Sequence, residues 1–274
     1  MNPIVSIILP TYNRSRFLDR AIGSVIDQTF KDWELIIIDD ASTDDTSEVL
    51  KKWQEKDDRI KVLRNEKNNY STIGISKNLN DGIRVARGKY IARLDDDDYW
   101  CHKDKLKMQV DFLENNSDYV IVGGGMIVVD GFGKEKFRYF KKENDQEVRN
   151  KALLSSPFSH TTVIFLKDAA EKVGFYGDNK LAEDWSLWLR LGRVGKFYNF
   201  PEYFTCYTMD GNNKSLSHLG QHAKIHFRLA WEYKNDYPGF FRAYSLASAQ
   251  YLYSFLPSFL RRYLDYSLSR MKRA

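Results

Sequence analysis

Short, mostly apolar runs alternate with helical repeats of apolar residues through the first hundred positions. The runs predict buried strands and lie at residues 4–9, 33–38, 60–63 and 90–94. Between the runs, apolar residues recur every three or four positions, which predicts helices that pack one face on a sheet. This alternation is typical of βαβ units, so the first half predicts a parallel sheet with right-handed crossovers.

The second half of the chain is less regular. Its pattern predicts a helix, a strand interrupted by three glycines, a further strand and another helix, at residues 103–114, 119–129, 161–166 and 183–191. Ser42 or Thr43, after the second apolar run, is expected to cap the next helix. The pattern as a whole predicts an α/β fold with a mostly parallel central sheet flanked by helices.

Composition narrows the class of protein. The 274 residues are 43% hydrophobic and 29% charged, which suits one globular domain or two closely packed halves. A net charge of +5 is too small for the dense basic patch of a nucleic-acid-binding domain, so we expect no nucleic-acid partner. The two cysteines, Cys101 and Cys206, exclude a disulfide-dense scaffold and fit a reducing cytoplasm. No run approaches the ~20 apolar residues that span a bilayer and no secretory signal is recognisable, so we expect a cytoplasmic location.

Polar clusters follow three of the predicted strands. Thr11, Tyr12 and Asn13 follow the first strand, residues 39–40 follow the second, and residues 95–98 follow the fourth. Ligands of open parallel sheets bind at the carboxyl ends of the strands. We therefore expect the three clusters to meet at one edge of the sheet and to form a binding site.

The run of four aspartates at residues 95–98 carries the most chemical information. Successive carboxylates repel one another, and a cation among them relieves the repulsion. Mg²⁺ and Mn²⁺ prefer carboxylate oxygens, and Mg²⁺ often shares its shell with substrate phosphates. The run therefore predicts a metal site that a diphosphate completes. A solvated acidic loop is the alternative, and for Asp39 and Asp40 the alternative is a turn with acids near a helix N-terminus.

Five blocks of sequence between residues 4 and 205 carry a resemblance when they are taken in order. They are Val5-Ser-Ile-Ile-Leu-Pro-Thr-Tyr-Asn-Arg14, Glu34-Leu-Ile-Ile-Ile-Asp-Asp-Ala-Ser-Thr-Asp44, Gly74-Ile-Ser-Lys-Asn78 with Ala86-Arg-Gly-Lys-Tyr-Ile-Ala92, Asp95-Asp-Asp-Asp-Tyr-Trp100 and Glu183-Asp-Trp-Ser-Leu-Trp-Leu-Arg190. In this order the blocks resemble glycosyltransferase family 2, the inverting enzymes of the GT-A fold. The resemblance implies a Rossmann-like GT-A domain, followed here by a helical C-terminal extension.

The resemblance implies donor contacts for individual residues. Contacts with the nucleotide sugar are implied for Pro10, Thr11, Tyr12, Asn13, Asp39, Lys77, Asn78, Asp95 and Asp96. Among them, Thr11, Tyr12 and Asp39 correspond to contacts with base and ribose. Asp95 corresponds to a contact with the ribose or with the water shell of the metal. Lys77 stands where many relatives carry Arg and lacks its bidentate fork.

The metal ligand and the catalytic base are implied in the same way. Asp97 matches the metal-ligating acid of the Asp-x-Asp block, whereas Asp96 fills the variable position and has no fixed role. Asp184 matches the catalytic base, and Glu183 is its neighbour. In an inverting transfer, this base takes the proton of the acceptor hydroxyl as the hydroxyl attacks the anomeric carbon. Without the resemblance, Glu183 and Asp184 would be read as ordinary acids near a helix N-terminus.

The implied activity is the transfer of one sugar from a nucleotide diphosphate, with uridine diphosphate favoured, to an acceptor hydroxyl. The implied cofactor is Mn²⁺ or Mg²⁺, and the implied acceptor is a saccharide or a lipid-linked saccharide in the assembly of surface polysaccharide or glycolipid. We expect residues 1–100 to bind the nucleotide sugar, residues 101–205 to bind the acceptor and hold the base, and residues 206–274 to form the extension.

Several further residues are candidates for acceptor or accessory contacts. They are His160, Glu183, Trp185, His218 and His222. A structural role is the alternative for His160. His218, His222 and His226 recur every four residues, so a helix aligns them on one face, where a metal site is an open alternative. His218 or His222 is also a candidate to close over the diphosphate as a third metal contact.

From residue 240 onward the chain is aromatic and basic. Such a segment can lie in an anionic membrane interface, which would place the protein at the inner face of the cytoplasmic membrane. The alternative is a segment that packs on the catalytic domain or on a second subunit. Pro257 is expected to kink any helix in this segment.

Two other function classes compete with this interpretation. A nucleotidyltransferase acting on sugar phosphates shares the sheet and the acids, but it usually has a Gly- and Arg-rich loop where this chain has residues 10–13. A non-catalytic module that binds sugar nucleotides is the other. A membrane-embedded polymerising synthase is not expected, because no spanning segment and no Gln-x-x-Arg-Trp sequence is present.

Overall fold

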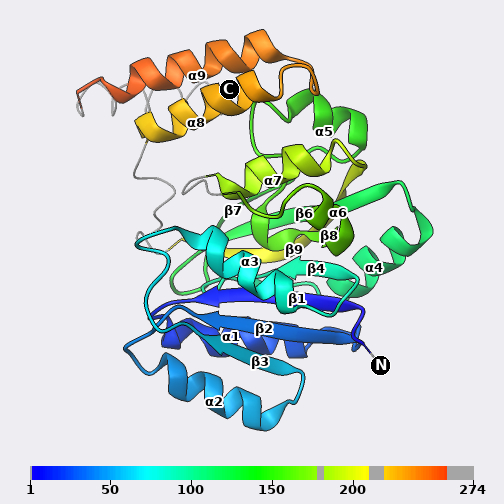
Figure 1. Cartoon of the computed structure of the whole chain (residues 1–274), viewed down its shortest axis with the longest axis vertical. Coiled ribbons are helices and arrows are strands. Elements are labelled where there is room, and N and C mark those ends of the chain that lie inside the picture. The colour runs from blue at the N-terminus through cyan, green and yellow to red at the C-terminus, as the bar shows by residue number, and fades with distance from the viewer. Residues whose placement is uncertain (1, 178–181, 210–218, 258–274) are drawn as a thin grey trace.

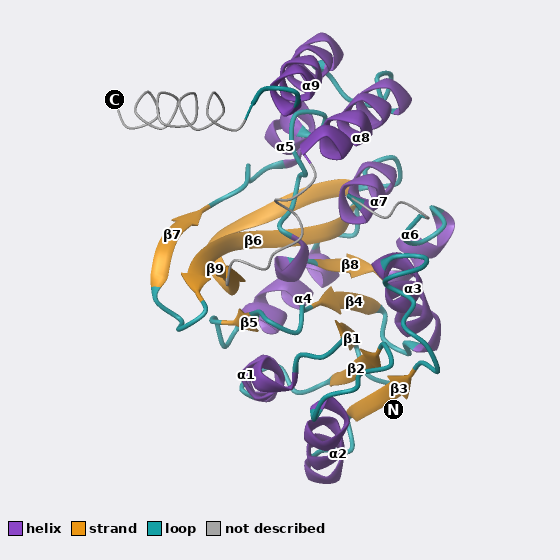
Figure 2. Ribbon diagram, turned by 90° about the vertical axis from the view of Figure 1, so that its left-hand side faces the viewer, coloured by secondary structure: helices purple, strands orange, loops and turns teal. Residues whose placement is uncertain are grey.

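The computed structural model describes residues 2–177, 182–209 and 219–257, which form one nine-stranded sheet with helices on both faces (Figures 1 and 2). The strands are β1 (Val5–Thr11), β2 (Trp33–Asp39), β3 (Ile60–Arg64), β4 (Tyr90–Arg93), β5 (Tyr99–Trp100), β6 (Tyr119–Asp130), β7 (Glu135–Tyr139), β8 (Ile164–Leu166) and β9 (Lys196–Met209). The helices are α1 (Ser15–Ile26), α2 (Thr46–Lys56), α3 (Ile75–Val85), α4 (Lys105–Asn115), α5 (Asp145–Lys151), η1 (His160–Thr162), α6 (Lys167–Lys172), α7 (Glu183–Leu191), α8 (Leu219–Glu232) and α9 (Phe240–Ser254).

The strand order is β3-β2-β1-β4-β8-β6-β9-β5, with β7 paired to β6. Strands β1 to β4 are parallel, β8 is antiparallel to both β4 and β6, and β9 is parallel to β6. Among the described strands, six therefore run in one direction, and β5, β7 and β8 run against them. The prediction of a mostly parallel sheet flanked by helices is confirmed.

Alternating side chains of the central strands supply the core on both faces of the sheet. Ile7 packs with α1 and α4, whereas its neighbour Ile8 packs with α3 on the other face. Both side chains are fully buried. A strand covered on both faces reads as a continuous apolar run, which explains why residues 4–9 showed no alternation.

Three predictions of local structure were wrong. The strand expected at residues 161–166 is shorter, because η1 occupies its first residues and only Ile164–Leu166 pair as β8. Strand β6 continues through the glycines at residues 123–125, where added Cβ atoms would collide with neighbouring side chains. Neither Ser42 nor Thr43 caps α2, which begins after Asp45. The Ser42 hydroxyl instead accepts a hydrogen bond from the backbone N–H of Asn13 at 3.0 Å.

The helical extension is present over its described residues. Helices α8 and α9 lie side by side at the end of the molecule opposite α2 (Figures 1 and 2). Leu229 and Ala230 of α8, and Tyr233 directly after it, are buried in the core that also holds Trp188 of α7. Helix α8 therefore packs on the domain built around the sheet. Among the described helices, none is long and apolar enough to cross a bilayer.

Candidate active site

The three predicted polar clusters meet at one edge of the sheet. Thr11 pairs with Asp39 at the ends of β1 and β2, and the backbone N–H of Asp40 donates to the carbonyl oxygen of Thr11 at 2.9 Å. At the end of β4, the N–H of Leu94 donates to the carbonyl oxygen of Ile8 at 3.2 Å. The convergence inferred from the alternation of elements is confirmed. Pro10, assigned to the donor site, is buried within β1.

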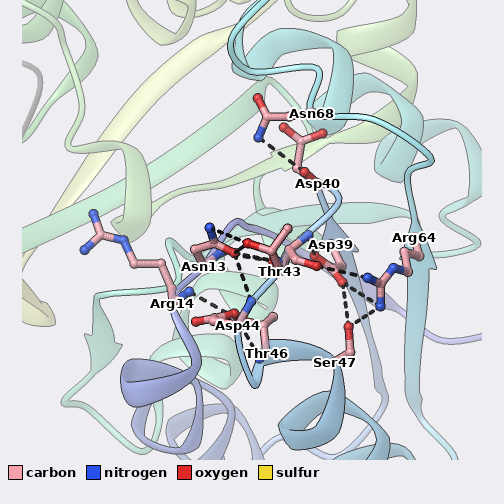
Figure 3. Close-up of polar contacts among 11 residues, drawn as sticks. Asn13, Arg14, Asp39, Asp40, Thr43, Asp44, Thr46, Ser47, Arg64 and Asn68 are labelled. Atoms are coloured by element: carbon pink, nitrogen blue, oxygen red, sulfur yellow. Dashed lines mark hydrogen bonds and ion pairs between the residues drawn. The ribbon is translucent and has the colours of Figure 1, made fainter.

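Asn13 fixes the loop after β1 to the loop after β2. Its side-chain oxygen accepts hydrogen bonds from the N–H groups of Thr43 at 2.7 Å and Asp44 at 3.4 Å (Figure 3). Asn13 and Ala41 both adopt left-handed backbone conformations, with φ of 52° and 64°. Asn tolerates this conformation better than most residues, because its short side chain bonds locally. The side chain of Asn13 thus shapes the site, and the adjacent Tyr12 is 42% exposed and available to a ligand.

Asp39 is buried and already has partners within the protein. One carboxylate oxygen accepts from the N–H of Ser42 at 2.9 Å, and the other accepts from the hydroxyl of Ser47 at 3.3 Å. The guanidinium of Arg64 lies 3.7 Å from the second oxygen (Figure 3). Contact between Asp39 and a nucleotide stays a prediction, and in this structure its carboxylate organises the loop after β2.

Asp40 orders the segment between β3 and α3, a role that the sequence did not predict. Its carboxylate accepts hydrogen bonds from the side chain of Asn65 at 2.7 Å and from the N–H groups of Asn69 and Tyr70, both at 2.9 Å. The amide oxygen of Asn78 accepts from Asn65 at 2.9 Å and from Asn69 at 3.2 Å. The predicted donor residue Asn78 therefore lies directly beneath this segment.

Lys77, the other predicted donor residue of α3, forms an ion pair with Asp81 one turn further along the helix. Both side chains are partly exposed. An exposed ion pair of this kind contributes little to stability, so Lys77 can exchange Asp81 for a ligand phosphate at small cost.

Arg93 is a buried cation at the centre of the site, and sequence reasoning missed it. Its guanidinium donates to the carbonyl oxygens of Ile8 at 2.7 Å and Leu94 at 2.8 Å, and it forms an ion pair with Asp95. Its Nε donates to His160 Nε2 at 3.2 Å. A charged residue inside a buried run, directly before a run of acids, was the signal that could have revealed it.

His160 is held in its neutral form by this arrangement. Burial, and then the nearby charge of Arg93, lower the pKa of His160 to about 3. The hydroxyl of Tyr176 lies 2.8 Å from the same ring nitrogen that Arg93 contacts. His160 thus sits beside the Arg93–Asp95 pair. Its assignment to the acceptor pocket stays a prediction.

The acids after β4 repel one another electrostatically. Burial, and then repulsion from Asp97, raise the pKa of Asp96 to about 7. Burial and the charges of Asp95 and Asp97 raise the pKa of Asp98 well above its usual range, and Asp98 also accepts from the N–H of Thr208 at 2.9 Å. Asp97 is largely buried, and a guanidinium nitrogen of Arg14 lies 3.8 Å from its carboxylate.

This donor set fits a divalent cation that a substrate completes. Within the described residues, no group of three His, Cys, Asp or Glu side chains is arranged to hold a metal ion. Mg²⁺ is often bound by one or two carboxylates together with substrate phosphates, so such a group is not required. Burial and then the charges of Asp97 and Asp95 raise the pKa of Asp96, and a bound cation would relieve the part that is due to repulsion.

Helix α7 brings Glu183 and Asp184 within electrostatic reach of the acids after β4. Burial, and then the charge of Asp184, raise the pKa of Glu183 to about 8. Burial also raises the pKa of Asp184, which the N–H of Trp185 and the charge of Lys141 lower in part. The charge of Asp95 adds to the rise in both pKa values. The ring of His160, which Arg93 contacts, packs edge to face on Trp188 of α7 with centroids 5.7 Å apart, so α7 lies beside the Arg93–Asp95 pair. The predicted base and the predicted donor site are thereby brought together.

Comparison with known proteins identifies the family. The model described as Glycosyl transferase family 2 matches residues 6–174, more than half of the chain. The chain belongs to this family. As a member it is a glycosyltransferase, and the matched span ends before Glu183 and Asp184. The role of Asp184 as the base therefore stays a prediction.

Relatives and solved structures agree with this assignment. The chain is 36% identical to EpsE of Bacillus subtilis over 205 residues, which are 73% of the chain and 71% of EpsE. It is 33% identical over 199 residues to a Campylobacter jejuni enzyme named GalNAc(5)-diNAcBac-PP-undecaprenol beta-1,3-glucosyltransferase, with coverage of 72% of the chain and 62% of that enzyme.

Two solved structures share the fold. Residues 1–349 of S. aureus TarS, solved with UDP-GlcNAc, give a TM-score of 0.70 at 22% identity, covering 93% of the chain and 73% of that TarS fragment. The mannosyltransferase PcManGT of Pyrobaculum calidifontis, solved with GDP-Man and Mn²⁺, has a TM-score of 0.66 at 16% identity, covering 100% of the chain and 81% of PcManGT. The GT-A fold inferred from the resemblance is confirmed.

Two residues near the α7 acids of this glycosyltransferase were not predicted. Lys141, between β7 and α5, lowers the pKa of Asp184 through its charge. Tyr70 belongs to the segment ordered by Asp40, and the charge of Glu183 adds to burial in raising the pKa of Tyr70. Both lie in irregular segments, where no periodic pattern indicates which element a side chain will approach.

Of the other accessory candidates, Trp185 lies on α7 and His222 lies on α8 of the extension. His226 is buried between the side chain of Gln250, at 3.1 Å, and the carbonyl oxygen of Leu153, at 2.7 Å. Both ring nitrogens of His226 are therefore used structurally, which removes the metal site that was an alternative for the three histidines. Trp185 donates to the carbonyl oxygen of Ala152 at 2.7 Å and packs against His226, so it anchors α7. His222 lies half-buried on α8, and His218 lies outside the described residues.

Proposed function

We propose that this glycosyltransferase moves one sugar, with inversion, from a nucleotide diphosphate to an acceptor hydroxyl. The observation that carries the proposal is the row of contacts that joins Asp95 to α7: Asp95 pairs with Arg93, Arg93 contacts His160, and His160 packs on Trp188, one turn of α7 from Asp184. An inverting transfer needs a leaving-group site and a base on opposite sides of one sugar. Uridine diphosphate is the proposed nucleotide, in line with the UDP-GlcNAc bound to TarS.

Asp184 is the proposed base. The acceptor oxygen attacks the anomeric carbon as the bond to the diphosphate breaks, the diphosphate leaves with the bonding electrons, and Asp184 takes the hydroxyl proton. Burial raises the pKa of Asp184, which makes its carboxylate a better proton acceptor than an exposed aspartate. Glu183, whose pKa of about 8 keeps it mostly protonated at neutral pH, leaves Asp184 as the charged member of the pair.

Asp97 is the proposed protein ligand of Mn²⁺ or Mg²⁺, with Asp95 near the ribose or the water shell of the ion. A bound divalent cation neutralises negative charge on the departing diphosphate. PcManGT was solved with Mn²⁺, which supports a metal of this kind in the shared fold. Tyr12, exposed at the end of β1, is the proposed stacking surface for the base.

A screen of nucleotide sugars tests the donor. In the presence of Mn²⁺, a UDP-sugar at ten times its Kd is expected to stabilise the protein by about 1.4 kcal/mol. For a chain of this size that raises Tm by about 3–5 °C. Release of UDP upon addition of an acceptor then separates a transferase from a module that only binds. Stabilisation by nucleoside triphosphates instead of nucleotide sugars would favour a nucleotidyltransferase and contradict the proposal.

We also propose that the enzyme works in the cytoplasm at the membrane surface, on a saccharide or lipid-linked saccharide for surface polysaccharide. The exposed aromatic side chains of Phe241 in α9 and of Phe255 directly after it support this proposal, as does the undecaprenol-linked acceptor in the name of the Campylobacter relative. Replacing both with Ser is expected to reduce flotation with phosphatidylglycerol vesicles several-fold. Equal flotation of the variant and the wild type would contradict membrane contact through α9.

A further inference from the structure

Strand β7 lies at an edge of the sheet and presents two different faces. It pairs with β6, with Tyr139 opposite Met126 and Phe137 opposite Val128, and in Figure 2 it lies on the outer side of β6. Successive side chains of a strand point to opposite faces, so Phe137 and Tyr139 share one face while Phe140 belongs to the other. The ring of Phe140 stacks on Tyr203 with centroids 4.3 Å apart, although Phe140 stays 45% exposed.

The face of Phe137 and Tyr139 is open and leads towards the active site. Their rings stack with centroids 6.3 Å apart, and Phe137 is 50% exposed. The hydroxyl of Tyr139 lies 3.2 Å from the hydroxyl of Ser159. Ser159 directly precedes His160, which contacts Arg93 at the centre of the site. A pair of aromatic rings that extends outward from an active site is suited to the apolar face of a sugar ring.

Lys141 stands where this face meets the catalytic base. Its ammonium nitrogen lies 5.8 Å from the centre of the Tyr139 ring, and its charge acts on Asp184. In the parts of the chain that the structure describes, no carboxylate lies within 4.0 Å of this nitrogen. Lys141 is half-buried. A half-buried cation is normally paired with an acid, so an ammonium group without a carboxylate within ion-pair distance can bind a negative group of a ligand.

We propose that Phe137, Tyr139 and Lys141 form an acceptor-binding face and that Lys141 selects acceptors that carry an anionic group. The rings hold the acceptor saccharide, and the ammonium group binds a phosphate or a carboxylate next to the hydroxyl that receives the sugar. Charge-assisted hydrogen bonds of this kind are among the stronger polar contacts in proteins. The inference rests on the proposed function, because it takes Asp184 as the base beside the acceptor hydroxyl.

Binding of small saccharides to the full-length protein tests this face. The probes are methyl β-D-glucoside, which is neutral, methyl β-D-glucuronide, which carries a carboxylate, and glucose 6-phosphate, each titrated by saturation-transfer NMR in the presence of UDP and Mn²⁺. We expect at least one anionic probe to bind about tenfold more tightly than the neutral one, and Lys141→Met to remove that preference. Lys141→Arg is expected to retain it, and the two anionic probes distinguish phosphate from carboxylate.

The chain offers matched controls on the same segment. Lys142→Met removes the next lysine, which pairs with Glu147 at 3.9 Å, and Phe140→Ser removes an aromatic ring from the opposite face of the strand. Neither is expected to change the preference for anionic probes. Phe137→Ser, by contrast, is expected to weaken all three probes several-fold. Titration of UDP with Mn²⁺ should give the same affinity for the wild type and for Lys141→Met.

Three results would overturn the inference. The first is that neutral and anionic probes bind equally, or that no probe binds. The second is an equal effect of Lys141→Met and Lys142→Met on probe binding, and the third is a loss of UDP affinity in Lys141→Met. The last would assign Lys141 to the donor. Turnover of a nucleotide sugar is measured separately. If the probes bind as expected but no nucleotide sugar is turned over, the proposed function fails while the binding face stands.

Discussion

Asp184→Asn is expected to lower kcat by about 10²- to 10⁴-fold, the contribution typical of a general base. The amide keeps the shape of the carboxyl but cannot take the acceptor proton. Donor affinity should be preserved, because Asp184 lies at the acceptor side of the proposed site. Steady-state kinetics of UDP release, together with calorimetric titration of UDP in the presence of Mn²⁺, measure the two effects independently.

Glu183→Gln is the matched control for this variant. Glu183 has a pKa of about 8 and is mostly protonated near neutral pH, so Gln reproduces its charge and the loss of kcat should be much smaller. Because the base must be ionised, wild-type kcat should fall as the pH drops through the pKa of Asp184, which lies above the ordinary value of 3.8. Near-normal turnover of Asp184→Asn would remove this residue from the mechanism.

Asp97→Ala is expected to abolish the dependence of nucleotide binding on metal. In the wild type, Mn²⁺ should tighten UDP binding at least about tenfold, as expected when a cation bridges a carboxylate and a diphosphate. In the variant, the Kd for UDP should be the same with Mn²⁺ and with a chelator. Calorimetric titration under both conditions measures the difference.

Asp111→Ala is a suitable control, because Asp111 is an exposed acid of α4 that pairs only weakly with Lys107. It should retain the full effect of Mn²⁺ on UDP binding. If Asp97→Ala retains that effect as well, another acid of the cluster holds the metal, and the assignment of Asp97 is wrong.

The first half of the fold could be predicted because its strands are covered on both faces. Residues 4–9 and 33–38 read as apolar runs, and the helices between them carry clear 3.6-residue periodicity. The edge at which Thr11, Asp39 and Asp95 meet follows from parallel topology alone. These features depend on local pattern and on general rules of connection, so a single sequence contains them.

The second half could not be predicted to the same extent, because its strands pair with distant partners. Strand β8 is three residues long and is inserted antiparallel between β4 and β6, which no local periodicity indicates. The same limit applies to the site. Lys141 and Asp184 are 43 residues apart in the sequence, and the charge of Lys141 nevertheless lowers the pKa of Asp184. Only tertiary packing brings the two residues together.

Arg93 has a consequence for how this site can change during evolution. Its guanidinium is fully buried, and among the described residues the acid that forms an ion pair with it is Asp95. Loss of one member of a buried ion pair costs about 3–5 kcal/mol, because the other charge is left without compensation. That is a large share of the ~5–15 kcal/mol by which folded proteins are typically stable. Substitutions at these two positions should therefore be strongly non-additive, and lineages that lose one are expected to lose the other.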